Sequence, residues 1–194
     1  VYLLGTAGPG EFRLGDTLLR QSDALLSDFV IKIDPQGISV WDDYFPGSLK
    51  AIAVDGTQNV YVAGEYNQVI EFGGTTYPSI GTGSQGMVFK LSASGSIAWF
   101  RNIASDQKAT GLKLSLGGDN RVLVGGSFSG NLSLGTLEYD FPAPAALDVF
   151  LAAYDAAGTL QYARRIAGEY EVYLYSVNAT RGDATYLTGI SIIP

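Results

Sequence analysis

The chain has 194 residues, of which 25 are glycine, and 46% are apolar; this composition supports a packed core and excludes a disordered chain. The formal net charge of −7 and the lack of any run of about 18 apolar residues exclude a nucleic-acid backbone as partner and insertion into a membrane. Cysteine and histidine are both absent, which excludes disulfides, thiolate nucleophiles, the usual zinc sites and Ser/His/Asp catalysis.

The sequence repeats itself with a period of about 60 residues. A short segment, made of an aromatic or aliphatic residue, any residue, a small or aliphatic residue and glycine, occurs once in each copy. Its four occurrences are Tyr2–Gly5, Tyr61–Gly64, Leu123–Gly126 and Tyr186–Gly189.

Three further markers follow in constant order in the first three copies. They are an apolar residue before glycine, a turn that closes on glycine, and a large aromatic residue four positions after that glycine. The apolar-glycine pairs are Leu14–Gly15, Phe72–Gly73 and Leu134–Gly135, the closing turns are Asp34–Gly37, Ser92–Gly95 and Asp155–Gly158, and the aromatic residues are Trp41, Trp99 and Tyr162. This constant order indicates a structural repeat.

In the middle copy the pattern predicts strands and turns. Short apolar runs alternate with turns that contain Gly, Asn or Asp, which is typical of antiparallel hairpins. The predicted strands are 51–55, 60–65, 69–72, 75–77, 86–91 and 96–103.

The segment Asp16–Ser27 of the first copy has leucines that recur with a helical spacing. The equivalent stretch of the second copy contains Pro78, Gly81 and Gly83, which would break a helix. We therefore expect a loop or a strand edge in both copies.

Such units cannot bury their apolar faces alone and must pack against neighbouring copies. Radial packing would give a β-propeller and linear stacking a solenoid; a meander of four strands with an extra hairpin favours the propeller blade. We predict an all-β chain with about three blades of roughly 60 residues, belonging to a larger closed propeller of about four to eight blades. The predicted repeats cover 1–50, 51–108 and 109–168, with a partial repeat at 169–194.

The markers resemble those of the bacterial β-propeller repeats often labelled SBBP. The resemblance covers essentially the whole chain. The matching stretches are Ala51–Asp55, Asn59–Gly64, Glu71–Thr76, Asp28–Gly37, Gly95–Trp99 and Gly126–Gly135. The third copy departs from the pattern, since Ala153 stands where the other copies have Lys32 and Lys90, and Leu123 stands where they have tyrosine.

The resemblance implies a secreted or cell-surface bacterial protein in which the propeller acts as a binding or spacer module. Together with the missing catalytic residue types, it leads to our hypothesis of a noncatalytic extracellular module that recognises another protein or a cell-surface polysaccharide. Two alternatives stay open: a segment of a secreted hydrolase or lyase whose catalytic residues lie outside this chain, and a structural subunit of a surface assembly. We expect no enzyme activity in this chain and no cofactor. We also expect that the chain is a segment of a longer polypeptide and contacts the remaining part of it.

The repeated aromatic residues Trp41, Trp99 and Tyr162 suit core packing, with sugar-stacking platforms as the alternative. Asp34 and Asp155 precede the closing glycines and suit the capping of turns, with calcium ligation as the alternative. The sequence therefore predicts no metal site and no catalytic residue, and the binding residues remain unassigned.

Three other groups of residues are candidates for function. Scattered carboxylates could supply the acid pair of a glycosidase, although such residues on strands are usually solvated: Asp42, Asp43, Glu65, Glu71, Glu138, Asp140, Glu169 and Glu171. The cluster Tyr170, Tyr173 and Tyr175 suits a mixed strand that faces a neighbouring blade or a partner. Asn131 and Asn178 begin glycosylation sequons, which are short enough to arise by chance.

Overall fold

Every regular element of the described chain is a β-strand, as the sequence predicts. The computed structural model describes residues 1–22, 27–79, 81–118, 120–134, 137–139, 147–180 and 184–192, without the side chains of 22 and 137–139. Within these ranges no helix is long and apolar enough to cross a membrane. The strands form several antiparallel sheets.

The central group of strands, which we call unit 2, has the plainest pairing. Its strands β6 (Ser48–Val54), β7 (Val60–Tyr66), β10 (Gln85–Leu91) and β11 (Ile97–Ser105) form a meander in which each strand pairs with the next. The hairpin β8 (Val69–Phe72) and β9 (Thr75–Pro78) is inserted between β7 and β10. All six predicted strands are confirmed, with ends that differ by a few residues; β6 begins at Ser48 instead of Ala51.

The same order recurs on both sides of unit 2. Unit 3 consists of β12 (Lys108–Leu116), β13 (Val122–Ser129), β14 (Leu132–Leu134), β15 (Leu137–Tyr139), β16 (Asp148–Tyr154) and β17 (Leu160–Ile166). Unit 1 consists of β1 (Tyr2–Ala7), β2 (Gly10–Leu14), β3 (Thr17–Ser22), β4 (Ser27–Ile33) and β5 (Ser39–Phe45), and the chain ends in the hairpin β18 (Val172–Ala179) and β19 (Thr185–Ser191). In each full unit the inserted hairpin follows the second strand, and β14 also pairs with β11 of unit 2.

The segment Asp16–Ser27 forms no helix in its described part. Residues 17–22 form strand β3 and Ser27 begins β4, while 23–26 lie outside the described residues. The expectation of a strand edge is therefore confirmed for residues 17–22, where β3 pairs with β2.

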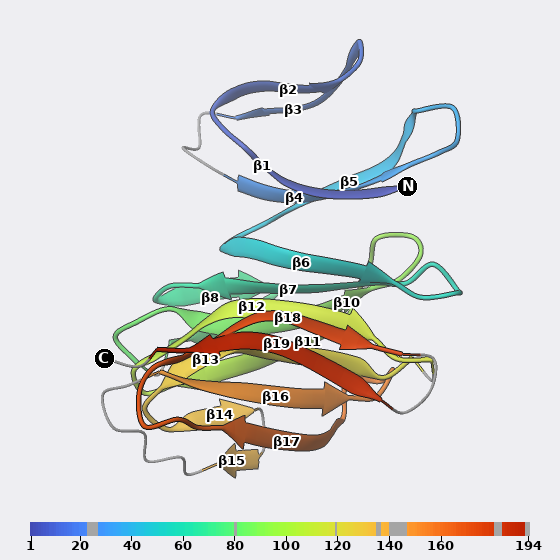
Figure 1. Cartoon of the computed structure of the whole chain (residues 1–194). Coiled ribbons are helices and arrows are strands. Elements are labelled where there is room, and N and C mark those ends of the chain that lie inside the picture. The colour runs from blue at the N-terminus through green and yellow to red at the C-terminus, as the bar shows by residue number, and fades with distance from the viewer. Residues whose placement is uncertain are drawn as a thin grey trace.

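A separate hydrophobic cluster fills each gap between successive units. Val30 and Phe45 of unit 1 share one cluster with Phe89 of unit 2. Unit 2 and unit 3 share the largest cluster, and unit 3 shares another with β18 and β19. Figure 1 shows unit 1 in blue above β6 and β7, with the later strands below. The facing sides of successive sheets are thus buried against each other, which is how a small sheet with apolar faces becomes stable. The other face of unit 1 packs within the unit, where Phe12 and Leu19 of its inserted hairpin cover Phe29.

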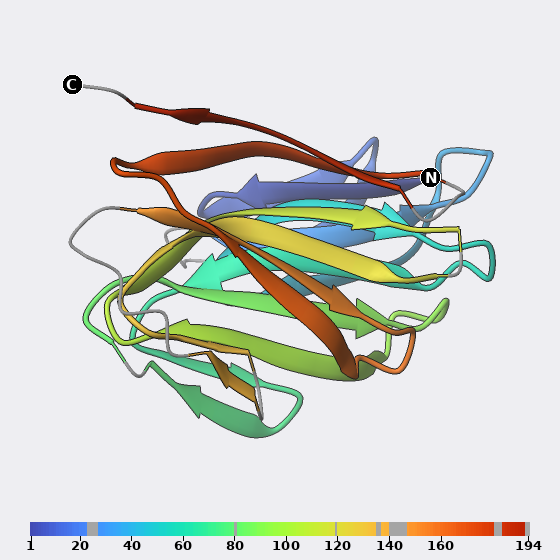
Figure 2. The same ribbon diagram turned by 60° about the horizontal axis from the view of Figure 1, so that its bottom comes forward.

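The first strands of successive units lie side by side. Strand β12 contacts β6 of unit 2 and also β18, and β18 further contacts β13 of unit 3. In Figure 2 the hairpin of β18 and β19, in red, lies along one border of the molecule.

Two kinds of tight turn occur at one end of units 2 and 3, because antiparallel strands return to the same end; unit 1 has the closing turn and the last hairpin has the inner turn. The inner turns join the first two strands; Asp55–Asn59 and Gly117–Arg121 have the same hydrogen-bond pattern, and the Thr180 amide likewise donates to the Ala184 carbonyl. The closing turns join the last two strands, and each ends in a glycine with positive φ. This turn-bearing end carries the candidate site.

Candidate functional site

The repeated tryptophan of one unit binds the closing turn of the next unit. Trp99 of unit 2 donates its indole Nε1–H to the Ala156 carbonyl of unit 3 over 3.1 Å. The Lys90 Nζ donates to the same carbonyl over 3.1 Å. Arg101, two residues after Trp99, adds a hydrogen bond of 2.6 Å from Nε to the Gly158 carbonyl. The three side chains of unit 2 therefore hold the turn of unit 3 through its backbone.

The contact between unit 1 and unit 2 has the same design. Trp41 donates to the Ala93 carbonyl over 3.1 Å, and Lys32 donates to that carbonyl over 3.0 Å. Both tryptophans are half-buried and pack against the clusters between units, as the core-packing interpretation expects. Sequence reasoning identified the residues but missed their partner, which lies in the following repeat.

The closing glycines are required by these rings. Gly95 and Gly158 have φ values of +91° and +79°, in the region that favours glycine. A Cβ added at Gly95 would lie 3.0 Å from Trp41 Cδ2, and one at Gly158 would lie 2.7 Å from Trp99 Cδ2. The glycine that each copy places at the end of its turn thus allows both the turn and the close approach of the preceding unit.

Unit 3 presents the same geometry without a following turn among the described residues. The Arg164 guanidinium lies 5.6 Å from the Tyr162 ring, as that of Arg101 lies 5.6 Å from the Trp99 ring. The Arg164 Nη1 donates to the Ala163 carbonyl over 2.7 Å, and Arg101 makes the equivalent bond over 2.7 Å to Phe100. Unit 3 differs in having Ala153 at the lysine position.

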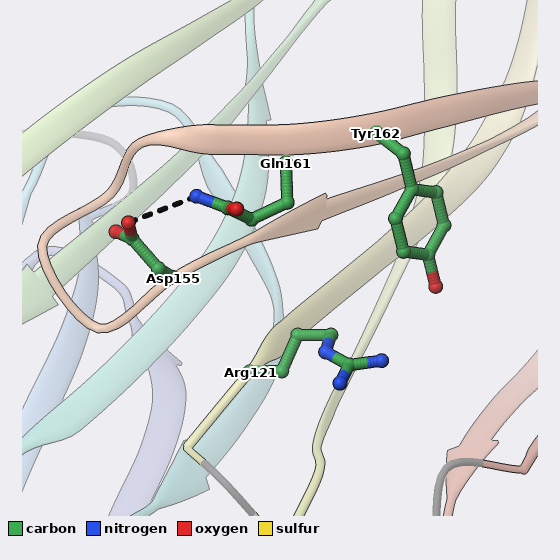
Figure 3. Close-up of a pocket in the computed structure, with 4 residues that line it drawn as sticks. All are labelled: Arg121, Asp155, Gln161 and Tyr162. Carbon is green, nitrogen blue, oxygen red and sulfur yellow. Dashed lines mark hydrogen bonds between the residues drawn. The ribbon is translucent and has the colours of Figure 1, made fainter.

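A cavity of about 450 Å³ opens beside Tyr162 and is also lined by Arg121, Asp155 and Gln161. Figure 3 shows these four side chains and the hydrogen bond of 2.9 Å from Gln161 Nε2 to Asp155 Oδ2. We call this surface the open aromatic face, made of Arg121, Asp155, Gln161, Tyr162 and Arg164.

A second cavity, of about 250 Å³, lies where three inner turns meet, and we call it the turn cavity. Its lining comes from units 2 and 3 and from the end of β18: Val54, Asp55, Gly56, Leu116, Gly117, Gly118, Asn120, Ala179 and Thr180. Among the described residues of this lining, Asp55 is the one with a charged side chain. Burial acts to raise the pKa of Asp55, but hydrogen bonds from Asn59 and Thr57 outweigh it and lower that pKa to about 2, so the carboxylate is ionised at neutral pH.

The aspartates of the closing turns accept hydrogen bonds from backbone amides of those turns. Asp34 Oδ1 accepts hydrogen bonds from the amides of Gln36 and Ile38, and Asp155 Oδ1 accepts those of Ala157 and Thr159. These bonds are the ones that the turn-capping interpretation expects. Within the described ranges no group of three acidic residues is placed to hold a metal ion.

The other carboxylates weighed for acid catalysis lie on several strands and loops. Asp42 and Asp43 are neighbours on β5, where alternate residues point to opposite faces; burial raises the pKa of Asp42, and Asp43 adds to this rise. Glu65 accepts a hydrogen bond of 2.6 Å from the Gly111 amide of unit 3. Glu71 and Glu169 are exposed, while the side chain of Glu138 and all of Asp140 lie outside the described residues.

The tyrosine cluster lies at and before β18. Tyr175 is 60% exposed and Tyr170 is 42% exposed, whereas the Tyr173 hydroxyl donates to Glu171 over 2.5 Å. Of the two sequon asparagines, Asn131 uses its side-chain amide to bind Asp106 over 3.1 Å, and Asn178 donates to Ser176 over 2.5 Å.

Comparisons with known proteins find no relative of this chain. No protein-family model matches the chain, and a search of curated proteins finds no match. The function is therefore argued from the site.

Proposed function

We propose that the chain forms blades of a β-propeller and serves as a noncatalytic extracellular module that binds a protein partner at its turn-bearing end. Three observations support the propeller: the four-strand meander with one inserted hairpin, the face-to-face packing of successive units, and the neighbouring first strands β6, β12 and β18. Radial packing of such meanders is the propeller architecture. The extracellular setting follows from the resemblance of the repeat.

The convergence of inner turns around the turn cavity is the observation that carries the binding function. Loops held by a rigid scaffold are common binding sites, and here the contacts between units hold the scaffold. The cavity offers the ionised Asp55 and the backbone of Gly117 and Gly118.

A protein partner suits this surface better than a polysaccharide. Sugar rings are usually held by exposed aromatic faces, but the turn cavity is lined by no aromatic residue among those described. The indole rings of Trp41 and Trp99 are engaged between units. The enzyme alternative gains no support from the arrangement of carboxylates described above.

The test uses a substitution that fills the cavity mouth without strain. A Cβ at Gly56 would meet nothing within 4 Å, and its φ is not in the positive range, so Gly56→Trp is expected to fold. Gly8 has equally open surroundings but lies between β1 and β2, so Gly8→Trp is the matched control.

Three proteins are immobilised: the native chain, the Gly56→Trp variant and the Gly8→Trp variant. Each is exposed to surface proteins and to purified polysaccharides of the producing cells. We expect a protein that binds the native chain and Gly8→Trp at least tenfold more tightly than Gly56→Trp. Binding of a polysaccharide alone, equal capture by all three chains, or hydrolysis of a polysaccharide by the native chain would overturn the proposal.

A further inference from the structure

The turn cavity is lined by equivalent positions of three successive repeats. The apolar part of its lining comes from the last residues of the first strands β6, β12 and β18, which are Val54, Leu116 and Ala179. The polar part includes the first residues of the three inner turns, which are Asp55, Gly117 and Thr180. In each of these turns the amide of the first residue donates to the carbonyl four positions later. The cavity therefore joins an apolar surface to turns of which, at this first position, only the one from unit 2 carries a charge.

The carboxylate of Asp55 is held in place by five hydrogen bonds from neutral donors. Its Oδ1 accepts the Thr57 amide over 2.9 Å, the Thr57 hydroxyl over 2.8 Å and the Asn59 amide over 2.9 Å. Its Oδ2 accepts the Asn59 side-chain amide over 2.8 Å and the Tyr61 hydroxyl over 3.2 Å. Among the described residues no cationic side chain forms an ion pair with Asp55. A fixed negative charge thus borders the cavity and is not neutralised within the described chain.

The size of the cavity and the state of its carboxylate together select the group that fits. At about 250 Å³ the cavity is smaller than the roughly 300–1,000 Å³ typical of small-molecule sites, and it suits one long side chain. Lysine and arginine combine an apolar stem with a cationic head. The guanidinium fork of arginine requires two accepting oxygens, but both oxygens of Asp55 already accept hydrogen bonds. The compact ammonium of lysine acts as a point charge and is the better match.

We propose that the turn cavity binds a lysine side chain of the protein partner, with the methylene stem against Val54, Leu116 and Ala179 and the ammonium beside Asp55. This inference rests on the function proposed above, because the lysine belongs to the protein that binds at the turn-bearing end. The net charge of −7 favours the approach of a basic partner at low ionic strength.

The test uses blocked pentapeptides in which four glycines surround one central residue, either lysine, norleucine or glutamate. Norleucine has the stem of lysine without the ammonium. Each peptide is titrated into the ¹⁵N-labelled chain, and binding is followed at the NMR signals of the Gly56, Gly117 and Gly118 amides, which belong to the lining. The titrations are repeated with Asp55→Asn and with Asp34→Asn. Asp34→Asn is the matched control, because Asp34 also accepts two amides of its own turn but does not line the cavity.

We expect the lysine peptide to bind the native chain and Asp34→Asn about threefold to fivefold more tightly than Asp55→Asn, the range for a charge pair near the surface. Norleucine should bind more weakly than lysine by a similar factor, and glutamate should not bind. Raising sodium chloride from about 0.05 M to about 0.5 M should remove most of the preference for lysine over norleucine. Circular dichroism verifies that both variants are folded.

Equal binding of the lysine and norleucine peptides, or equal losses in Asp55→Asn and Asp34→Asn, would overturn this inference. If Gly56→Trp abolishes the capture of a surface protein while the peptides bind alike, the binding function stands and the lysine inference alone is refuted. A cavity that prefers lysine, in a chain that captures no surface protein, would instead refute the binding function.

Discussion

The three closing glycines form a natural series for measuring the contact between units. Gly37, Gly95 and Gly158 have φ values of +84°, +91° and +79°, so an alanine at any of them meets similar backbone strain, about 1–2 kcal/mol. They differ in what the new methyl group would contact. At Gly37 it meets nothing within 4 Å, and at Gly158 it lies 2.7 Å from the Trp99 ring.

Gly37→Ala is therefore expected to lower the free energy of unfolding by the strain alone, about 1–2 kcal/mol. Gly158→Ala must in addition push the indole of Trp99 away from the turn. Forcing extra volume into a packed contact costs about 1–3 kcal/mol, and the displaced ring strains its hydrogen bond to Ala156. We expect Gly158→Ala to destabilise the chain by about 1–3 kcal/mol more than Gly37→Ala, with Gly95→Ala nearer to Gly158→Ala.

Urea unfolding followed by far-ultraviolet circular dichroism measures these differences without relying on tryptophan emission. A double-mutant cycle assigns the extra cost to the ring: in a Trp99→Ala background, Gly158→Ala should cost only its strain, giving a coupling of about 1–3 kcal/mol. Equal destabilisation by Gly37→Ala and Gly158→Ala, or no coupling to Trp99, would refute the reasoning.

Four further substitutions probe other contacts by the same unfolding measurement. Trp99→Phe keeps the ring but loses the hydrogen bond to Ala156, and should cost about 1 kcal/mol; a neutral effect would contradict the geometry. Arg165→Ala removes the ion-pair partner of Asp148, whose side chain is 3% exposed, and should lower the free energy of unfolding by about 3 kcal/mol or more. Arg13→Ala breaks an exposed ion pair and should lower it by under about 1 kcal/mol. The pKa of Asp55 in the folded chain is about 2, below its ordinary 3.8. The ionised carboxylate therefore contributes to the free energy of unfolding in full above the ordinary pKa, and this contribution disappears as the pH falls toward 2. We expect a contribution of about 1 kcal/mol after solvent screening, and Asp55→Asn should make the free energy of unfolding less dependent on pH over that range.

The local structure of each unit was predictable because its signals are local. Glycine at the positive-φ position and aspartate accepting two turn amides specify the closing turn within five residues. Alternating apolar runs specify the flanking strands. For this reason the predicted hairpins of unit 2 agree with the observed strands to within a few residues.

The contacts between units were not predictable from the same signals. Trp99 and Ala156 are 57 residues apart, and only the packing of unit 2 on unit 3 brings them together. The substitution of lysine by Ala153 is visible in the sequence as divergence between copies. Its structural meaning, the loss of a donor toward the next closing turn, emerges from the bond that Lys90 makes in unit 2.

On its turn side, the contact between units is made by backbone atoms and not by side chains. The indole and lysine donors bind a carbonyl oxygen, the arginine binds another, and the ring needs only a missing Cβ at glycine. The turns Ser92–Gly95 and Asp155–Gly158 share no residue except their alanine and glycine, yet both fit. The first residue of each turn accepts a turn amide with a side-chain oxygen, that of Ser92 in one unit and that of Asp155 in the next. The alanine contributes its carbonyl, so the partner unit does not depend on which of these two residues caps the turn.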